Sequence, residues 1–307
     1  MRRSLPRGVL LSLIAFLVVA GGVWAFSRLL VESLLGDPDA DGAGQPEAVA
    51  ILRIQGGIFD ARAAVRSLER LGRRPGVKAV LLRIDSPGGA VSPTQEIYQE
   101  VLRLRKAGVK VVASMGSVAA SGGYYVAAAA DKIYANPGTI TGSIGVVMVL
   151  PDVQKAMGTL GLRMNVIKSG PNKDVASPFR PMTDKDREIL QRLVDDTYAQ
   201  FVRAVAEGRK MPQERVREIA DGSIYSGERA KEIGLVDALG TEREAILEAA
   251  RLGGIKGEPR LIELKPEAGL WSLLQNWAGP WSGWFGTEGG RFFGGTPAVL
   301  EYMWRLS

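Results

Sequence analysis

Short apolar runs alternate with amphipathic stretches through the middle of this 307-residue chain. The segments 48–54 and 77–85 are rich in β-branched residues and almost continuously apolar, which is typical of strands buried on both faces of a parallel sheet. Between them, residues 61–71 have the apolar spacing of a helix. This alternation predicts an α/β fold with right-handed crossover connections.

The same alternation continues to about residue 250. We expect a helix from Ser92, which would act as its N-cap, with Gln95 completing a capping box. A longer helix should follow Thr183, with Asp186 in the corresponding box position. Further strands are predicted at residues 109–114, 132–135, 144–150 and 162–168, and two or three short helices between 214 and 250.

The stretch 110–131 combines a buried strand, a short Gly/Ser turn and an Ala-rich helix that opens near Ser121. A helix N-terminus presents unpaired backbone N–H groups and the positive end of the helix dipole. Gly122 and Gly123 would let another backbone or a substrate carbonyl approach closely. Ser121 is therefore a candidate nucleophile, and the alternative is that it serves only as an N-cap.

Residues 8–27 are twenty consecutive uncharged, mainly apolar residues, long enough to cross a bilayer as a helix. Three arginines precede this stretch and acidic residues follow it, which places the N-terminus in the cytoplasm and the rest outside. A cleaved signal peptide is the alternative. We expect a single-pass cell-membrane protein with this organisation: anchor 1–30, flexible stalk 31–47, folded α/β domain 48–250 and a Trp/Gly-rich extension 251–307.

Composition excludes several kinds of chemistry. The chain has no cysteine and no histidine, so disulfides, thiolate nucleophiles, Ser-His-Asp triads and histidine-ligated zinc are all impossible. The net charge of +6 is spread over mixed-sign segments, without a basic, aromatic-rich run that would indicate nucleic acid. No phosphate-binding or dinucleotide signature appears, so we expect neither a metal nor another cofactor.

A serine hydrolase without histidine needs another base, and lysine is the usual alternative. An ordinary lysine has a pKa of about 10.4, and burial must lower this value by roughly 2 to 3 before the amine is useful near neutral pH. The base should therefore come from a structured, partly apolar segment. Lys173 is the first candidate and Lys168 the competing one. Asp174 must point away from a catalytic Lys173, because a close carboxylate favours the charged amine.

Acyl transfer also requires donors for the oxyanion. The backbone amide of Gly122 is one expected donor, and Gly88 or Gly89 in the turn DSPGG is the second. Both glycine loops follow predicted strands, and such loops gather at the carboxyl edge of a parallel sheet, where ligands bind.

Four motifs carry a family resemblance: DSPGG (85–89), AASGGYY (119–125), TGSIGV (141–146) and SGPNKDVASPF (169–179). In order and spacing they resemble the bacterial signal peptide peptidases of the SppA family, which are membrane-anchored serine–lysine proteases. The resemblance implies a ClpP/crotonase-like fold, a repeated β-β-α spiral. It also implies Ser121 as nucleophile, Lys173 as general base, Ser143 as the hydroxyl bonded to the lysine amine, and an oxyanion hole from Gly88 and Gly122.

The resemblance further implies a homo-oligomeric ring in which two protomers complete each site. Ser121 and Lys173 of one chain should then lie too far apart to hydrogen-bond. The expected function is degradation of cleaved signal peptides and other unfolded hydrophobic segments outside the cytoplasm. Three alternatives remain: a related protease with a specific membrane-protein substrate, a crotonase-type acyl-CoA enzyme, and a catalytically silent scaffold.

Overall fold

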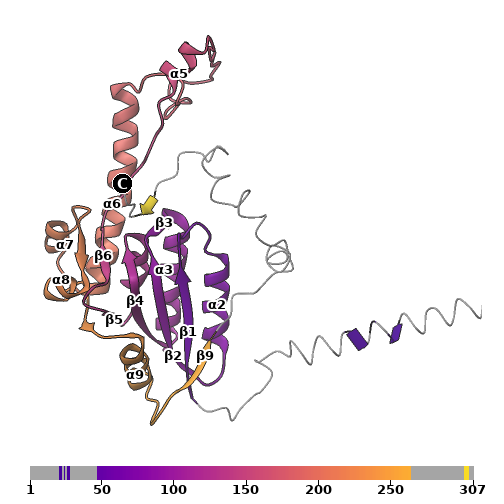
Figure 1. Cartoon of the computed structure of the whole chain (residues 1–307), viewed down its shortest axis with the longest axis vertical. Helices are drawn as coiled ribbons and strands as arrows, with labels where there is room; N and C mark the ends of the chain where they lie inside the picture. Colours follow the sequence, from indigo (N-terminus) through magenta and orange to yellow (C-terminus); the bar gives the residue numbers. More distant parts are fainter. Residues whose placement is uncertain (1–20, 23, 25, 28–46, 264–300, 304–307) are drawn as a thin grey trace, which may run out of the picture. The chain divides into compact units, whose positions relative to one another are not determined.

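The computed structural model describes residues 47–263 and 301–303, together with Gly21, Gly22, Trp24, Phe26 and Ser27. By its internal contacts the chain divides into two units, Met1–Gln45 and Pro46–Ser307. Strands and helices alternate through the second unit, as the sequence predicts (Figure 1).

The core of this unit is a mostly parallel sheet of eight strands. Its main path runs β7-β6-β4-β2-β1-β9, while β5 pairs with β4 and β8. All pairings in this sheet are parallel except that of β6 with β7. The strands are β1 (Ala48–Gln55), β2 (Val77–Ser86), β4 (Lys110–Ala120), β5 (Lys132–Ala135), β6 (Ile140–Gly142), β7 (Ile224–Ser226), β8 (Ala238–Leu239) and β9 (Arg260–Glu263).

Helices cover both faces of the sheet, which explains why its central strands are almost continuously apolar. In β1, Val49 and Ile51 pack in a cluster with α9, whereas Leu52 and Ile54 join the larger core beneath α2, α3, α4 and α6. The helices are α2 (Arg62–Arg73), α3 (Val91–Lys106), α4 (Gly122–Ala127), α5 (Gln154–Thr159), α6 (Asp184–Arg209), α7 (Gln213–Ile219), α8 (Gly227–Glu232) and α9 (Glu242–Leu252).

A second, two-stranded sheet joins segments far apart in the chain. Strand β3 (Gly88–Ala90) pairs antiparallel with β10 (Glu301–Met303). Strand β9 likewise extends the main sheet past residue 250, where the sequence placed the end of the domain. Parts of the expected extension 251–307 are therefore strands of the folded unit, whereas 264–300, with its tryptophans, lies outside the described residues.

Two local expectations are wrong. The Gly/Ser turn expected after residue 114 is absent, because β4 continues to Ala120, pairing first with β5 and then with β6. The expected capping box at Ser92 is also absent: α3 begins at Val91, and its N-cap is Ala90, without a side-chain cap. By contrast, the box of Thr183 and Asp186 at the start of α6 is confirmed.

The strands expected at 144–150 and 162–168 do not form either. The second segment is exposed, with Ile167 fully accessible, and no strand among the described residues pairs with it. Figure 1 shows α5 and the N-terminal part of α6 projecting away from the sheet. We call residues 147–182 the arm. It exposes a set of large apolar side chains: Val147, Val149, Leu160, Leu162, Met164, Val166, Ile167, Phe179 and Met182.

The expected membrane span, residues 8–27, lies mostly outside the described residues. The five of its residues that are described are helical and exposed. Among all the described residues, no helix is both long and apolar enough to cross a bilayer.

Close packing between α6 and the end of α4 provides a test of the fold. A Cβ added at Gly208 would lie 1.9 Å from the carbonyl oxygen of Ala128. Gly208→Ala should lower the free energy of unfolding by about 1–3 kcal/mol, because backbone must move to relieve the overlap. Thermal or urea unfolding measures the change. Gly158→Ala, at a helical glycine with nothing within 4 Å, is the matched control and should not destabilise the protein. Equal stability of the two variants would contradict the packing.

Candidate active site

Ser121 occupies a strained backbone position between β4 and α4. Its φ of 51° and ψ of −115° lie in a region that residues with a Cβ rarely adopt. Such a conformation costs on the order of 1–3 kcal/mol and is held by its surroundings. The Ser121 amide donates to the Gly142 carbonyl (2.8 Å), and the Ser121 carbonyl accepts from the Tyr125 amide (2.8 Å).

The Ser121 side chain does not stabilise the start of α4. It accepts no cap hydrogen bond from α4, so the alternative reading of this serine as a conventional N-cap is wrong. The residue is only 1% exposed, and no hydrogen bond of its hydroxyl occurs within the described part of the chain. A hydroxyl on a strained turn that makes no hydrogen bond to the described residues is available for chemistry.

Gly123 sets the distance between this turn and the neighbouring strand. A Cβ at Gly123 would lie 2.7 Å from the carbonyl oxygen of Ser86, at the end of β2. Only glycine permits this approach. Gly123 therefore lets the turn after Ser121 lie against the end of β2, as the sequence suggested.

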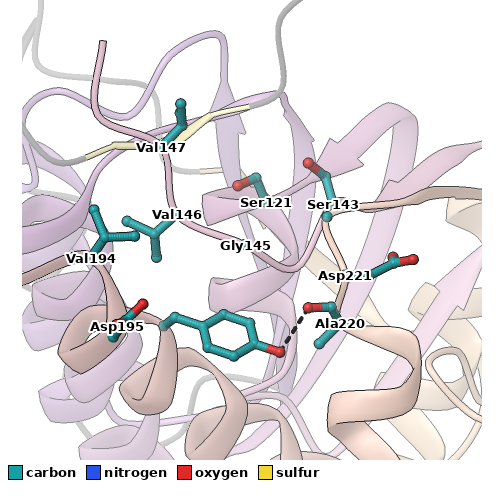
Figure 2. Close-up of a pocket in the computed structure, with 11 residues that line it drawn as sticks. Ser121, Ser143, Gly145, Val146, Val147, Val194, Asp195, Ala220 and Asp221 are labelled. Atoms are coloured by element: carbon teal, nitrogen blue, oxygen red, sulfur yellow. Dashed lines mark hydrogen bonds between the residues drawn. The ribbon is translucent and has the colours of Figure 1, made fainter. Parts of the chain in front are cut away.

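Ser143 lies directly after β6, next to the Ser121 turn. It too has a positive φ, 49°, and its amide donates to the Ser223 carbonyl (2.7 Å). Ser121 and Ser143 line one cavity of about 480 Å³, and Figure 2 shows their side chains close to each other at its edge. The remaining walls come from the 145–147 segment, α6 and the turn before β7: Gly145, Val146, Val147, Val194, Asp195, Tyr198, Ala220, Asp221 and Gly222.

Two acidic residues of this cavity escaped the sequence analysis. Asp195 accepts a hydrogen bond from Gln191 (2.7 Å), and hydrogen bonds from Ser223 hold the pKa of Asp221 below its usual value. Asp221 therefore stays ionised at neutral pH. The sequence indicates a turn at the Asp-Gly pair 221–222, but the position of this turn beside Ser121 depends on how α6 and α7 pack.

Lys173 does not line this cavity. It is exposed on a turn within the arm, and no hydrogen bond joins its amine to Ser121 or to any other described residue. Lys168, the competing base, donates to Asp174 (2.6 Å) and to the Pro171 carbonyl (3.0 Å). These two acceptors occupy the Lys168 amine, which argues against Lys168 as the base.

The two expected oxyanion donors differ in availability. Gly122 supplies the first amide of α4, which has no partner within the helix. The Gly88 amide instead donates to the Ser86 hydroxyl (3.1 Å), which itself donates to the Gly56 carbonyl (2.7 Å). In this structure Gly88 is therefore not a free donor, because a buried serine already occupies its N–H.

Comparison with known proteins decides the family. Residues 103–256, about half of the chain, match peptidase family S49. The chain belongs to this family. It is 44% identical over 218 residues to a putative protease of Synechocystis, a match that covers 70% of this chain and 77% of the relative. It is 42% identical over 224 residues to a putative protease of Methanocaldococcus jannaschii, covering 71% of each chain.

A putative signal peptide peptidase SppA of Enterococcus faecium is 37% identical over 196 residues, with 64% of this chain and 55% of that protein covered. Residues 51–141 also match the Clp protease family. The SppA-family resemblance and the Clp-protease-like α/β fold are thus confirmed. This S49 member is a protease by family.

The approach of Gly123 to β2 provides a test of the site. Gly123→Ala should lower peptidase activity at least tenfold, because the new methyl group pushes the Ser121 turn away from Ser86. Initial rates on an apolar peptide, with circular dichroism to verify folding, measure the effect. Gly138→Ala, with nothing within 4 Å, should keep full activity. Unchanged activity of the folded Gly123 variant would rule out this role for the glycine.

Proposed function

We propose that this S49 peptidase is a serine endopeptidase with Ser121 as nucleophile and Lys173 as general base. One observation carries the proposal: Ser121 lies at a strained strand-to-helix turn and lines a cavity together with Ser143, and its hydroxyl makes no hydrogen bond to the described residues. A chain without histidine or cysteine has few other groups to activate a hydroxyl.

In the proposed reaction, the Ser121 hydroxyl attacks the peptide carbonyl while an uncharged Lys173 amine accepts its proton. The protonated amine then gives this proton to the leaving amine, and water hydrolyses the acyl-enzyme with the lysine again acting as base. Ser143 would orient the lysine amine by a hydrogen bond. The Gly122 amide would stabilise the oxyanion, and Gly88 would join it if its amide exchanged Ser86 for the substrate.

A second copy of the chain would supply the lysine. The separation between Lys173 and the Ser121 cavity supports this proposal, and so do the apolar side chains of the arm. Exposed apolar surface of this extent is typical of protein–protein contact. A homo-oligomeric ring would cover the arm and remove water from around Lys173, which the uncharged amine requires.

The substrate would lie along β3 in an extended conformation. Strand β10 already pairs antiparallel with β3, with Tyr302 opposite Gly89, so this edge accepts an extended segment. Ala90 bonds to Ile58 on one edge of β3, and backbone groups of successive residues point to opposite edges, so Gly89 faces β10. The valines of the cavity would favour apolar side chains.

We further propose that the 8–27 segment anchors the enzyme as a single-pass membrane protein with its peptidase domain outside the cytoplasm. Anchoring would hold the site near the membrane, where cleaved signal peptides and other unfolded hydrophobic segments are released. These segments are the proposed substrates.

Active-site titration tests the two catalytic roles together. Ser121→Ala should abolish covalent labelling by a serine-directed acylating probe, and Lys173→Ala should slow labelling and peptide cleavage at least 10³-fold. Lys231→Ala, at an exposed lysine of α8, is the control and should retain labelling. Cleavage at the wild-type rate by Ser121→Ala or by Lys173→Ala would refute the dyad. A wild-type protein that the probe never labels would instead be a silent scaffold.

Disruption of β10 tests the proposed binding edge. Tyr302→Pro removes a backbone N–H and should weaken the pairing with β3, so that a competing peptide binds more easily. The expected result is a lower KM for an apolar peptide with little change in kcat. Tyr302→Phe keeps the N–H and should behave like the wild type. An unchanged or higher KM in the proline variant would contradict substrate binding at this edge.

A further inference from the structure

The loop that carries Lys173 is fastened to α6 by one guanidinium group. Arg180 donates from Nε to Asp174 Oδ2 (3.0 Å) and from Nη2 to Asp174 Oδ1 (3.0 Å). The same Nη2 also donates to the Asp174 backbone carbonyl (3.0 Å) and to Asp186 Oδ1 (3.1 Å). A further bond joins Arg180 Nη1 to Asp186 Oδ2. Both the side chain and the backbone of the residue next to Lys173 are thus held.

The other end of this connection is rigid. Asp186 is the capping-box residue of α6, and its carboxylate also accepts from the Thr183 amide (3.0 Å). The far end of α6 is anchored in the core by buried side chains such as Phe201 and Val205. A bidentate arginine between two aspartates therefore fixes the position of the Lys173 turn relative to the folded domain.

We call the ion pairs of Arg180 with Asp174 and Asp186 the clamp. The clamp also balances charge beside Lys173. The Asp174 side chain is only 10% exposed, and hydrogen bonds from Arg180 and Lys168 hold its pKa well below the usual value. An ionised Asp174 without these cations would favour the charged form of the neighbouring amine. Asp152 is another charged group at the clamp among the described residues. It lines a small cavity with Arg180 and Asp186, and its carboxylate accepts a hydrogen bond from the Gln154 amide.

We propose that Arg180 is a positioning residue for Lys173: it ties the Lys173 turn to α6 through Asp174 and Asp186 and, with Lys168, compensates the Asp174 charge. The inference rests on the proposed role of Lys173 as base. It assigns a function to a residue that touches neither the Ser121 cavity nor the reacting atoms.

The test compares full-length variants by pH–rate profile on an apolar peptide, with thermal unfolding measured in parallel. Arg180→Gln should lower kcat at least tenfold at pH 7. It should also move the acidic limb of the profile to higher pH by about half a unit or more, because Asp174 loses its main counter-charge. Arg192→Gln is the control: Arg192 is exposed on the same helix, its ion pair within the described part of the chain is with Glu188 (3.3 Å), and its replacement should leave both quantities unchanged.

Two further variants separate position from charge. Arg180→Lys keeps the positive charge but loses the bidentate hydrogen bonding of the guanidinium group. We therefore expect kcat to fall while the acidic limb of the pH–rate profile stays in place. Asp174→Asn combined with Arg180→Gln removes both charges, so the limb should return toward the wild-type position without recovery of kcat. These variants also keep the test decisive if Arg180→Gln proves unstable.

The outcomes distinguish this inference from the proposed function. If Lys173→Ala is inactive and Arg180→Gln matches Arg192→Gln within twofold, the role of Arg180 is refuted and the dyad stands. A limb unmoved in every Arg180 variant would refute the charge-balancing role. If Lys173→Ala keeps wild-type activity, the proposed base itself is wrong.

Discussion

The close approach of three strand ends around Ser121 is the constraint on which the site depends. Gly123 lets the start of α4 approach the Ser86 carbonyl, and the Gly142 carbonyl binds the Ser121 amide from the other side. These contacts hold a non-glycine residue at positive φ, with its hydroxyl turned toward the cavity rather than toward its own helix. The buried, two-sided sheet supplies the rigidity that such strain requires.

The proposed nucleophile and the proposed base lie on different parts of the fold. Ser121, Gly122 and Ser143 lie at the carboxyl ends of strands in a sheet covered on both faces, whereas Lys173 lies on the arm, whose apolar side chains are exposed in the single chain. A base carried in this way needs a support of its own. The salt-bridged Arg180 between Asp174 and Asp186 provides that support, because it transmits the position of α6 to the Lys173 turn.

Much of this was accessible from the sequence, and the failures have physical causes. The β-branched runs at 48–54 and 77–85 are strands because helices cover both faces, as their composition predicted. The 162–168 segment was also predicted to be a strand, but no strand among the described residues pairs with it. Strand propensity alone was therefore insufficient. Arg180 carries no local signal, and the Asp221–Gly222 pair indicates only a turn. Their partners are set by the packing of α6, which no spacing rule records.

By itself the sequence determined the α/β alternation, the family motifs and the absence of imidazole and thiol chemistry, since these depend on residue identity and local order. Only the tertiary structure decided that the Ser121 side chain does not cap its helix and that the Gly88 amide donates to Ser86. These facts depend on contacts between residues distant in the chain. Such contacts form only when the sheet and α6 bring strand ends and loops together.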